Sequence, residues 1–227
     1  QEKYGFGGDY PQFSILDPEV TYSLSDHQIA CGLADAYTHV LEQYLTTPGQ
    51  SRIMDRWAEG VLLSVMEIAP KIKTNSRDYD LMADYMLAAT LALNDFIRMG
   101  ITQDWATHQI GHELTALHGI THGHSLAIVM PGLLRVLKKQ KHAKLLQYGE
   151  RVFGIMDGSE EERVDKAIAM TEEFYRSLGL TTRLSEEGIG NKTIETIARR
   201  FNERNVAYGE NRNVTGDVTR EILKSCS

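Results

Sequence analysis

The stretch "SLSDHQIACGLADAYTHVLEQYL", residues 23–45, has the pattern of one long amphipathic helix. Ser25 is a typical N-cap, and Gln28 three positions later completes a capping-box signature, in which two otherwise unpaired backbone N–H groups are satisfied. Apolar residues then recur at helical spacing; they are Ile29, Leu33, Ala36, Val40 and Leu41. The stretch therefore predicts a helix that starts at Ser25 and buries one face.

The chain after residue 45 continues in the same way. The segment 78–100 is apolar on several faces, as a central core helix would be. Asp104 is the expected N-cap of a helix that Gly119 ends, and Pro131 is expected near a kink or first turn. Alternation at period two is scarce, which favours an all-α domain. The predicted further helices are 52–73, 78–100, 104–117, 124–137, 141–156, 159–179, 191–204 and 215–226.

Residues 1–24 have a different character. They are rich in Gly, Pro and Tyr and contain one short β-like run, "QFSIL" at 12–16, which Asp17-Pro18 interrupts. The first residue is Gln rather than Met, so we expect the sequence to be a piece of a longer chain.

Composition and charge narrow the class of partner. The net charge is -7, and no basic cluster occurs, which argues against binding to nucleic acid or to an anionic membrane. No apolar run is long enough to span a bilayer, and Cys31 and Cys226 form no Cys-x-x-Cys pair. We expect a cytoplasmic protein whose partner is a small molecule or a second copy of the chain.

Five of the eight histidines fall within "THQIGHELTALHGITHGH", residues 107–124. On a helix His108 and His112 differ by about 40° and share one face, whereas His118 is rotated by about 240° from His112. The sequence is not the zincin motif H-E-x-x-H, since Ala116 occupies the position of the second histidine. His108 and His112 can therefore reach one site, and His118 is not expected to join them.

Together with two residues far upstream, the clustered histidines form a candidate metal site. Asp35 and His39 also stand four apart on a helix, although a buried Asp–His hydrogen bond would explain that pair as well. Just past the predicted end of the helix at Gly119 come His122 and His124, of which one is expected to face the site because alternate residues of an extended loop point opposite ways. One carboxylate with three imidazoles suits Fe or Zn with an open position. Spacing alone chooses neither between His122 and His124 nor whether His112 is a ligand.

The combined motif resembles a known family. Asp35-x-x-x-His39-x-x-Glu42-x-Tyr44, followed by His108-x-x-x-His112 and His122, is similar to the signature of the iron-containing (group III) alcohol dehydrogenases. Within that family the likeness is to the NADPH-dependent butanol dehydrogenase and aldehyde reductase branch. The phrases "LDPEVTYSLS", "QDWATHQIGHELTALHG", "SLAIVMP", "AKLLQYGERVFGI" and "GENRNVT" carry it along essentially the whole chain.

The resemblance implies a set of site residues. Its metal ligands would be Asp35, His39, His108 and His122. His112 matches a position that lines the active site, with a role in substrate contact or proton relay. His118 and His124 match no ligand position, and His27 and His142 are expected at the surface. Trp105, Phe96 and Met99 could wall the cleft, with core packing the favoured interpretation for each.

The resemblance also implies an architecture and a chemistry. Family members join an N-terminal dinucleotide-binding domain to a dehydroquinate synthase-like helical metal-binding domain, and they commonly form dimers. No Gly-x-Gly-x-x-Gly turn occurs here, so residues 1–24 would be the end of the missing domain and the crossover, and 25–227 the helical catalytic domain. A divalent Fe(II) or Zn(II) would polarise the alcohol or aldehyde oxygen while hydride passes to or from NADP(H). We expect the isolated fragment to bind metal, to be nearly inactive, and to expose apolar surface where the other domain would pack.

Two other classes of protein fit the histidine pattern less well. A helical metallohydrolase would use a metal-activated water, but the adjacent His-Asp pair of the HD type is absent and Asp26-His27 has the reverse order. A structural metal module would favour a closed, cysteine-rich site, and no cysteine stands near the expected ligands.

Overall fold

The computed structural model describes residue 3 and residues 11–227, and in these residues nine α-helices and no β-strand occur. The first element is a 3-10 helix, η1 (Pro18–Ser23). The helices are α1 (Asp26–Tyr44), α2 (Arg52–Thr74), α3 (Tyr79–Ala92), α4 (Ala106–His118), α5 (His122–Val136), α6 (Lys138–Phe153), α7 (Glu160–Ser177), α8 (Asn191–Glu203) and α9 (Gly216–Ser225), with a short 3-10 turn, η2 (Ser185–Glu187), before α8. The predicted all-α fold is confirmed.

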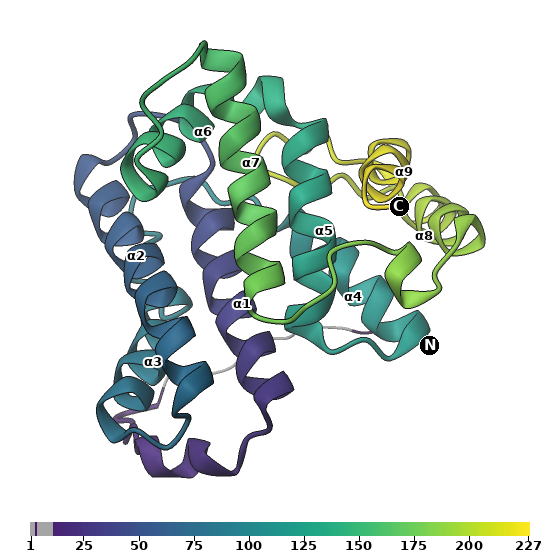
Figure 1. Ribbon diagram of the computed structural model, residues 1–227. Coiled ribbons are helices and arrows are strands. Elements are labelled where there is room, and N and C mark those ends of the chain that lie inside the picture. The colour runs from purple at the N-terminus through teal and green to yellow at the C-terminus, as the bar shows by residue number, and fades with distance from the viewer. Residues whose placement is uncertain (1–2, 4–10) are drawn as a thin grey trace.

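Helix α1 is the centre of the molecule. It packs on α2 and α3 on one side and on α5 on the other, while α8 and α9 pair beyond α5 (Figure 1). The predicted capping box is present, since Ser25 accepts from the N–H of Gln28 and the Gln28 side chain accepts from the N–H of Ser25. Leu33, Ala34, Tyr37, Val40 and Leu41 are each no more than 2% exposed. A helix buried to this degree gives a rigid base for any side chain that it presents.

Helix α3 differs from its prediction. It ends at Ala92 rather than at residue 100, because Asp95 has a left-handed backbone (φ 71°) and the Asn94 side chain accepts from the N–H of Phe96 in a local turn. It is not a central core helix either: Leu87 is 52% exposed. Its apolar residues lie partly on one buried stripe and partly on the exposed face of the helix.

Two helix starts are shifted by a few residues. Asp104 does not occupy the N-cap position of α4, which is Trp105 in a left-handed conformation (φ 65°), but its carboxylate accepts from the N–H of Ala106 and so still caps the first turn. Helix α5 begins at His122, and Pro131 lies inside it. Gly119 ends α4 with φ 71°, as predicted.

The N-terminal lead has no strand in its described part. Residues 12–16, the β-like run, are unpaired, with Phe13 79% and Ile15 84% exposed. Further exposed apolar side chains lie on α2 and α3, among them Trp57 and Leu87. Within the described residues, none of the helices is both long enough and apolar enough to cross a bilayer.

Candidate metal centre

The carboxylate of Asp35 lies at the centre of the candidate site. Its Oδ1 atom is 3.5 Å from Nε2 of His122, 3.7 Å from Nε2 of His108 and 3.9 Å from Nε2 of His39. Three imidazole rings from three different helices therefore point the same nitrogen at one oxygen. His39 is the farthest of the three from Asp35, and its ring stacks on that of His108 with centroids 4.3 Å apart.

The fold brings these residues together by a close helix crossing. Asp35 and His39 stand one turn apart on α1, His108 comes from the first turn of α4, and His122 is the first residue of α5. At Gly123 a Cβ atom would lie 1.9 Å from the carbonyl oxygen of Cys31, so only glycine allows α5 to approach α1 this closely. The crossing places His122 next to Asp35.

The donor set fits a metal ion. Two atoms of the set, Asp35 Oδ1 and His108 Nε2, are buried and, among the described residues, have no hydrogen-bond partner. Distances of 3.5–3.9 Å are too long for hydrogen bonds. Ligand atoms about 2.1 Å from a tetrahedral ion stand roughly 3.4 Å apart, close to these separations. Asp35, His108 and His122 each offer an atom within 4.8 Å of the other two.

Glu42 holds His108 in place. Its carboxylate, 2% exposed, binds Nδ1 of His108 and accepts from the backbone N–H groups of Thr107 at 2.6 Å and His108 at 3.3 Å. The family motif includes Glu42, but no contact was predicted for it from the sequence. The available signal was its register, because Asp35, His39 and Glu42 follow at i, i+4 and i+7 on one face of α1.

The ionisation of the histidines follows from burial and from the two carboxylates. Burial, reinforced by the neighbouring His108, lowers the pKa of His39 to about 3, and burial lowers the pKa of His122 to about 4. Burial also disfavours a charged His108, but Glu42 and Asp35 outweigh it and raise its pKa to about 9. At neutral pH His39 and His122 are therefore uncharged and offer lone pairs, whereas a metal at His108 would have to displace a proton.

His112 borders the site. Its ring centroid is 4.9 Å from that of His122 and 6.5 Å from that of His108. Burial, with Lys3 and His108 adding to it, lowers its pKa to about 4, so the ring is neutral near pH 7. The structure brings it beside the cluster without bringing it to Asp35.

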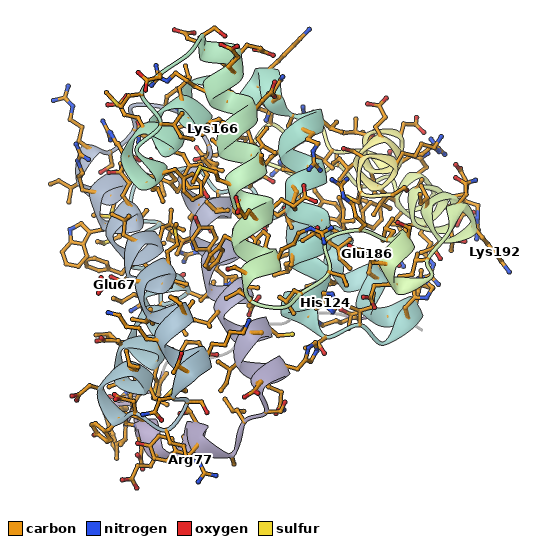
Figure 2. All side chains as sticks on the ribbon, in the orientation of Figure 1. Glu67, Arg77, His124, Lys166, Glu186 and Lys192 are labelled. Atoms are coloured by element: carbon orange, nitrogen blue, oxygen red, sulfur yellow. The ribbon has the colours of Figure 1, made fainter. Side chains whose placement is uncertain are left out.

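The other histidines lie apart from Asp35. His118 bonds Thr193 of α8 at 2.9 Å, and His124 bonds Thr181 at 2.6 Å, beside the η2 segment that carries Glu186 (Figure 2). The expectation of a loop around His122 and His124 is wrong, because both residues lie in the first turn of α5. Their side chains still point in opposite directions, because residues two apart on a helix lie on opposite faces. His27 is exposed, and His142 is partly exposed near Glu160.

Of the three residues expected as possible cleft walls, one contacts the histidines. Trp105 meets His39 and His108 edge-on, with centroids 5.6 and 5.1 Å away. Phe96 instead packs on Trp57 at 4.7 Å, and Met99 is 51% exposed.

An all-α domain in which histidines from three helices converge on one aspartate carboxylate defines a narrow structural class. The family model for the C-terminal part of the Fe-containing alcohol dehydrogenases matches residues 29–227, and the chain belongs to that family. The resemblance predicted from the motifs is confirmed, and it disfavours the metallohydrolase alternative.

Individual relatives agree with the family match. The chain is 46% identical over 216 residues to the NADPH-dependent aldehyde reductase YqhD of Escherichia coli, covering 95% of this chain and 56% of the relative. It is 33% identical to the probable NADH-dependent butanol dehydrogenase 1 of Bacillus subtilis, covering 99% and 59%. The chain thus spans less than two thirds of the length of these relatives.

Solved structures show the same fold. The substrate- and cofactor-free aldehyde reductase YqhD of E. coli superposes with a TM-score of 0.93 at 45% identity, covering 96% of this chain and 58% of that one. The NADH-dependent butanol dehydrogenase A of Thermotoga maritima gives a TM-score of 0.91 at 29% identity, covering 100% and 59%.

Proposed function

We propose that this chain is the helical catalytic domain of a metal-dependent NAD(P)H alcohol dehydrogenase or aldehyde reductase. The proposed ligands are Asp35, His39, His108 and His122. The observation that carries the proposal is the convergence of three imidazole Nε2 atoms on one carboxylate oxygen at 3.5–3.9 Å, with no hydrogen bond between them. Such an arrangement leaves buried polar atoms unsatisfied, at a cost of about 1–3 kcal/mol each, unless a cation joins them.

The chemistry of the bound ion would be that of a Lewis acid, which stabilises negative charge on the alcohol or aldehyde oxygen. The chain's own residues define where that oxygen can approach. The side chains of His108 and His39 are 7% and 12% exposed, whereas those of Asp35 and His122 are 31% and 27% exposed. The open side of the site is therefore the one bordered by Asp35 and His122.

His112 is proposed to act on that open side. Its neutral ring lies next to His122, where it can donate or accept one hydrogen bond from a substrate hydroxyl or a water molecule. This position supports a role in substrate contact or in passing a proton to solvent. Trp105 would wall the site on the side of His39 and His108.

The nicotinamide cofactor is proposed to bind mainly to a part of the full protein outside this sequence. We assign residues 1–24 to the end of that dinucleotide-binding domain and its crossover, and residues 25–227 to the helical domain. NADP(H) is favoured because the relative at 46% identity is named NADPH-dependent, although the relative from B. subtilis is named NADH-dependent. Native Fe(II) or Zn(II), a homodimer and small alcohols or aldehydes as substrates belong to the same proposal.

The deciding experiment measures metal content by ICP-MS on anaerobically purified chain. About one Fe or Zn per chain supports the proposal when Asp35→Ala, His39→Ala, His108→Ala and His122→Ala each remove it. Retention of the metal in any of these variants removes that residue from the ligand set. NADPH-dependent reduction of short aldehydes by the full-length enzyme, lost in the same variants, tests the activity itself.

A further inference from the structure

Glu42 connects the two helices that supply most of the candidate site. It lies on α1, on the same face as Asp35 and His39, yet its side chain reaches the first turn of α4. The N-cap residue of α4, Trp105, makes no side-chain capping bond. Glu42 replaces that cap from another helix, since its two oxygens accept from the N–H groups of Thr107 and His108.

Glu42 also fixes where α4 begins. Its backbone carbonyl accepts from the N–H of Asp104 at 2.9 Å, just before the helix. One residue of α1 therefore holds the chain on both sides of Trp105, by its main chain before that residue and by its carboxylate after it. Through these contacts Glu42 ties the first turn of α4, which carries His108, to the helix that carries Asp35.

The same carboxylate decides which nitrogen of His108 faces the site. An ionised carboxylate only accepts hydrogen bonds, so the Nδ1 atom that it contacts must carry a proton. In the neutral ring the lone pair is then on Nε2, the atom that lies 3.7 Å from Asp35 Oδ1 and has no hydrogen-bond partner among the described residues. A carboxylate on the outer nitrogen of a histidine is a common way to orient that histidine toward a metal.

We infer that Glu42 is a positioning residue for the proposed metal centre, setting the tautomer and orientation of His108 and holding α4 against α1. The inference rests on the proposed function. It does not make Glu42 a ligand, because its carboxylate is already bound to Nδ1 of His108 and to two backbone N–H groups.

The informative variant is Glu42→Gln, which keeps the shape of the side chain. The amide oxygen can still accept from a backbone N–H, but an amide NH₂ group facing Nδ1 favours the tautomer with the proton on Nε2, which has no lone pair to offer. The matched control is Glu59→Gln on α2, because Glu59 is also a buried glutamate, 3% exposed, and binds Tyr44 and Arg151 at 2.9 Å.

The experiment titrates both variants and the unaltered 227-residue chain with Zn²⁺ against a chromophoric chelator. Glu42→Gln is expected to weaken zinc binding by about 10- to 100-fold, while Glu59→Gln leaves the affinity unchanged. In ¹⁵N-edited NMR spectra of the zinc-loaded protein, the Nδ1 proton of His108 should resonate far downfield in the unaltered chain and move upfield in Glu42→Gln.

Three results would overturn the inference. Equal zinc affinity in Glu42→Gln and the unaltered chain would remove the positioning role while leaving the proposed ligands intact. An equal loss in Glu42→Gln and Glu59→Gln would mean a general effect on stability. An unaltered chain that binds no zinc would overturn the proposed ligand set first, and the role of Glu42 with it.

Discussion

Asp35 on α1 and His122 at the start of α5 approach within 3.5 Å, Oδ1 to Nε2, without forming a hydrogen bond. Gly123 makes this approach possible, because its missing side chain lets α5 lie against the Cys31 carbonyl. The distance between one carboxylate and one imidazole thus depends on a single glycine beside them.

The first prediction concerns stabilisation by metal. Zn²⁺ at a hundredfold excess over its Kd should stabilise the unaltered chain by about 2.7 kcal/mol, which corresponds to roughly 5–10 °C in Tm for a domain of this size. His122→Ala should abolish that shift, whereas His124→Ala, which loses a bond to Thr181, should keep it on a lower starting Tm. Differential scanning calorimetry with and without zinc measures both. A full shift in His122→Ala would contradict the proposed ligand role.

The second prediction concerns Gly123. Alanine there would place Cβ against the Cys31 carbonyl and force α1 and α5 apart. We therefore expect the unfolding free energy to fall by about 1–3 kcal/mol and zinc binding to weaken. Gly60→Ala on α2 is the control, since nothing lies within 4 Å of its added Cβ, and it should stabilise by about 0.5–1 kcal/mol. Urea unfolding compares the two, and unchanged zinc affinity in Gly123→Ala would separate the helix crossing from the site.

The third prediction concerns His112. Its replacement by alanine should leave one metal per chain, because the ring lies beside His122 and not at Asp35. In the full-length enzyme we expect turnover to fall by about 10²–10⁴-fold if the ring moves a proton. Metal analysis and steady-state kinetics are measured on the same preparation. A preparation that has lost its metal would identify His112 as a ligand instead.

The fourth prediction concerns pH and the metal-free chain. Because burial lowers the pKa of His39 to about 3 and the pKa values of His112 and His122 to about 4, the unfolded chain binds more protons below pH 6.5, so stability should rise from pH 4 to 6.5. His108 has the opposite sign: its pKa is raised to about 9, so its contribution is complete below pH 6.5 and is lost as the pH rises toward 9.

Urea midpoints measured with a chelator present test the pH prediction. The pair of variants His112→Asn and His122→Asn should flatten the acidic slope, and Glu42→Gln should reduce the fall between pH 6.5 and 9. An unaltered acidic slope in both asparagine variants would contradict the assignment of the slope to these rings.

Much of the fold was accessible from the sequence because its signals are local. The capping box of Ser25 and the αL end at Gly119 both depend on residues within one helical turn. The end of α3 was missed because the apolar pattern continues past Ala92, while the break comes from the positive φ of Asp95 and the turn at Asn94. Neither of these two residues interrupts a hydrophobic pattern.

The candidate site, like the fold, could be predicted from the sequence only in part. The pairs Asp35–His39 and His108–His112 follow from helical spacing, but the choice of His122 over His124 came from family resemblance and stays a prediction as a ligand assignment. The contact of Glu42 with His108 could not be predicted from either helix alone, because it exists only when α4 packs against α1. How one helix packs against another cannot be read from the sequence pattern of either helix.

The central position of α1 has a consequence for exchange with solvent. Its amides should be among the slowest to exchange with deuterium, since the helix is covered by α2, α3 and α5 and can open only when much of the domain opens. Asp35, His39 and Glu42 share that helix, so local opening of α1 offers no route to the site. Asp35 and His122 are the more exposed of the proposed ligands, so an ion would exchange on their side of the site while α1 stays folded.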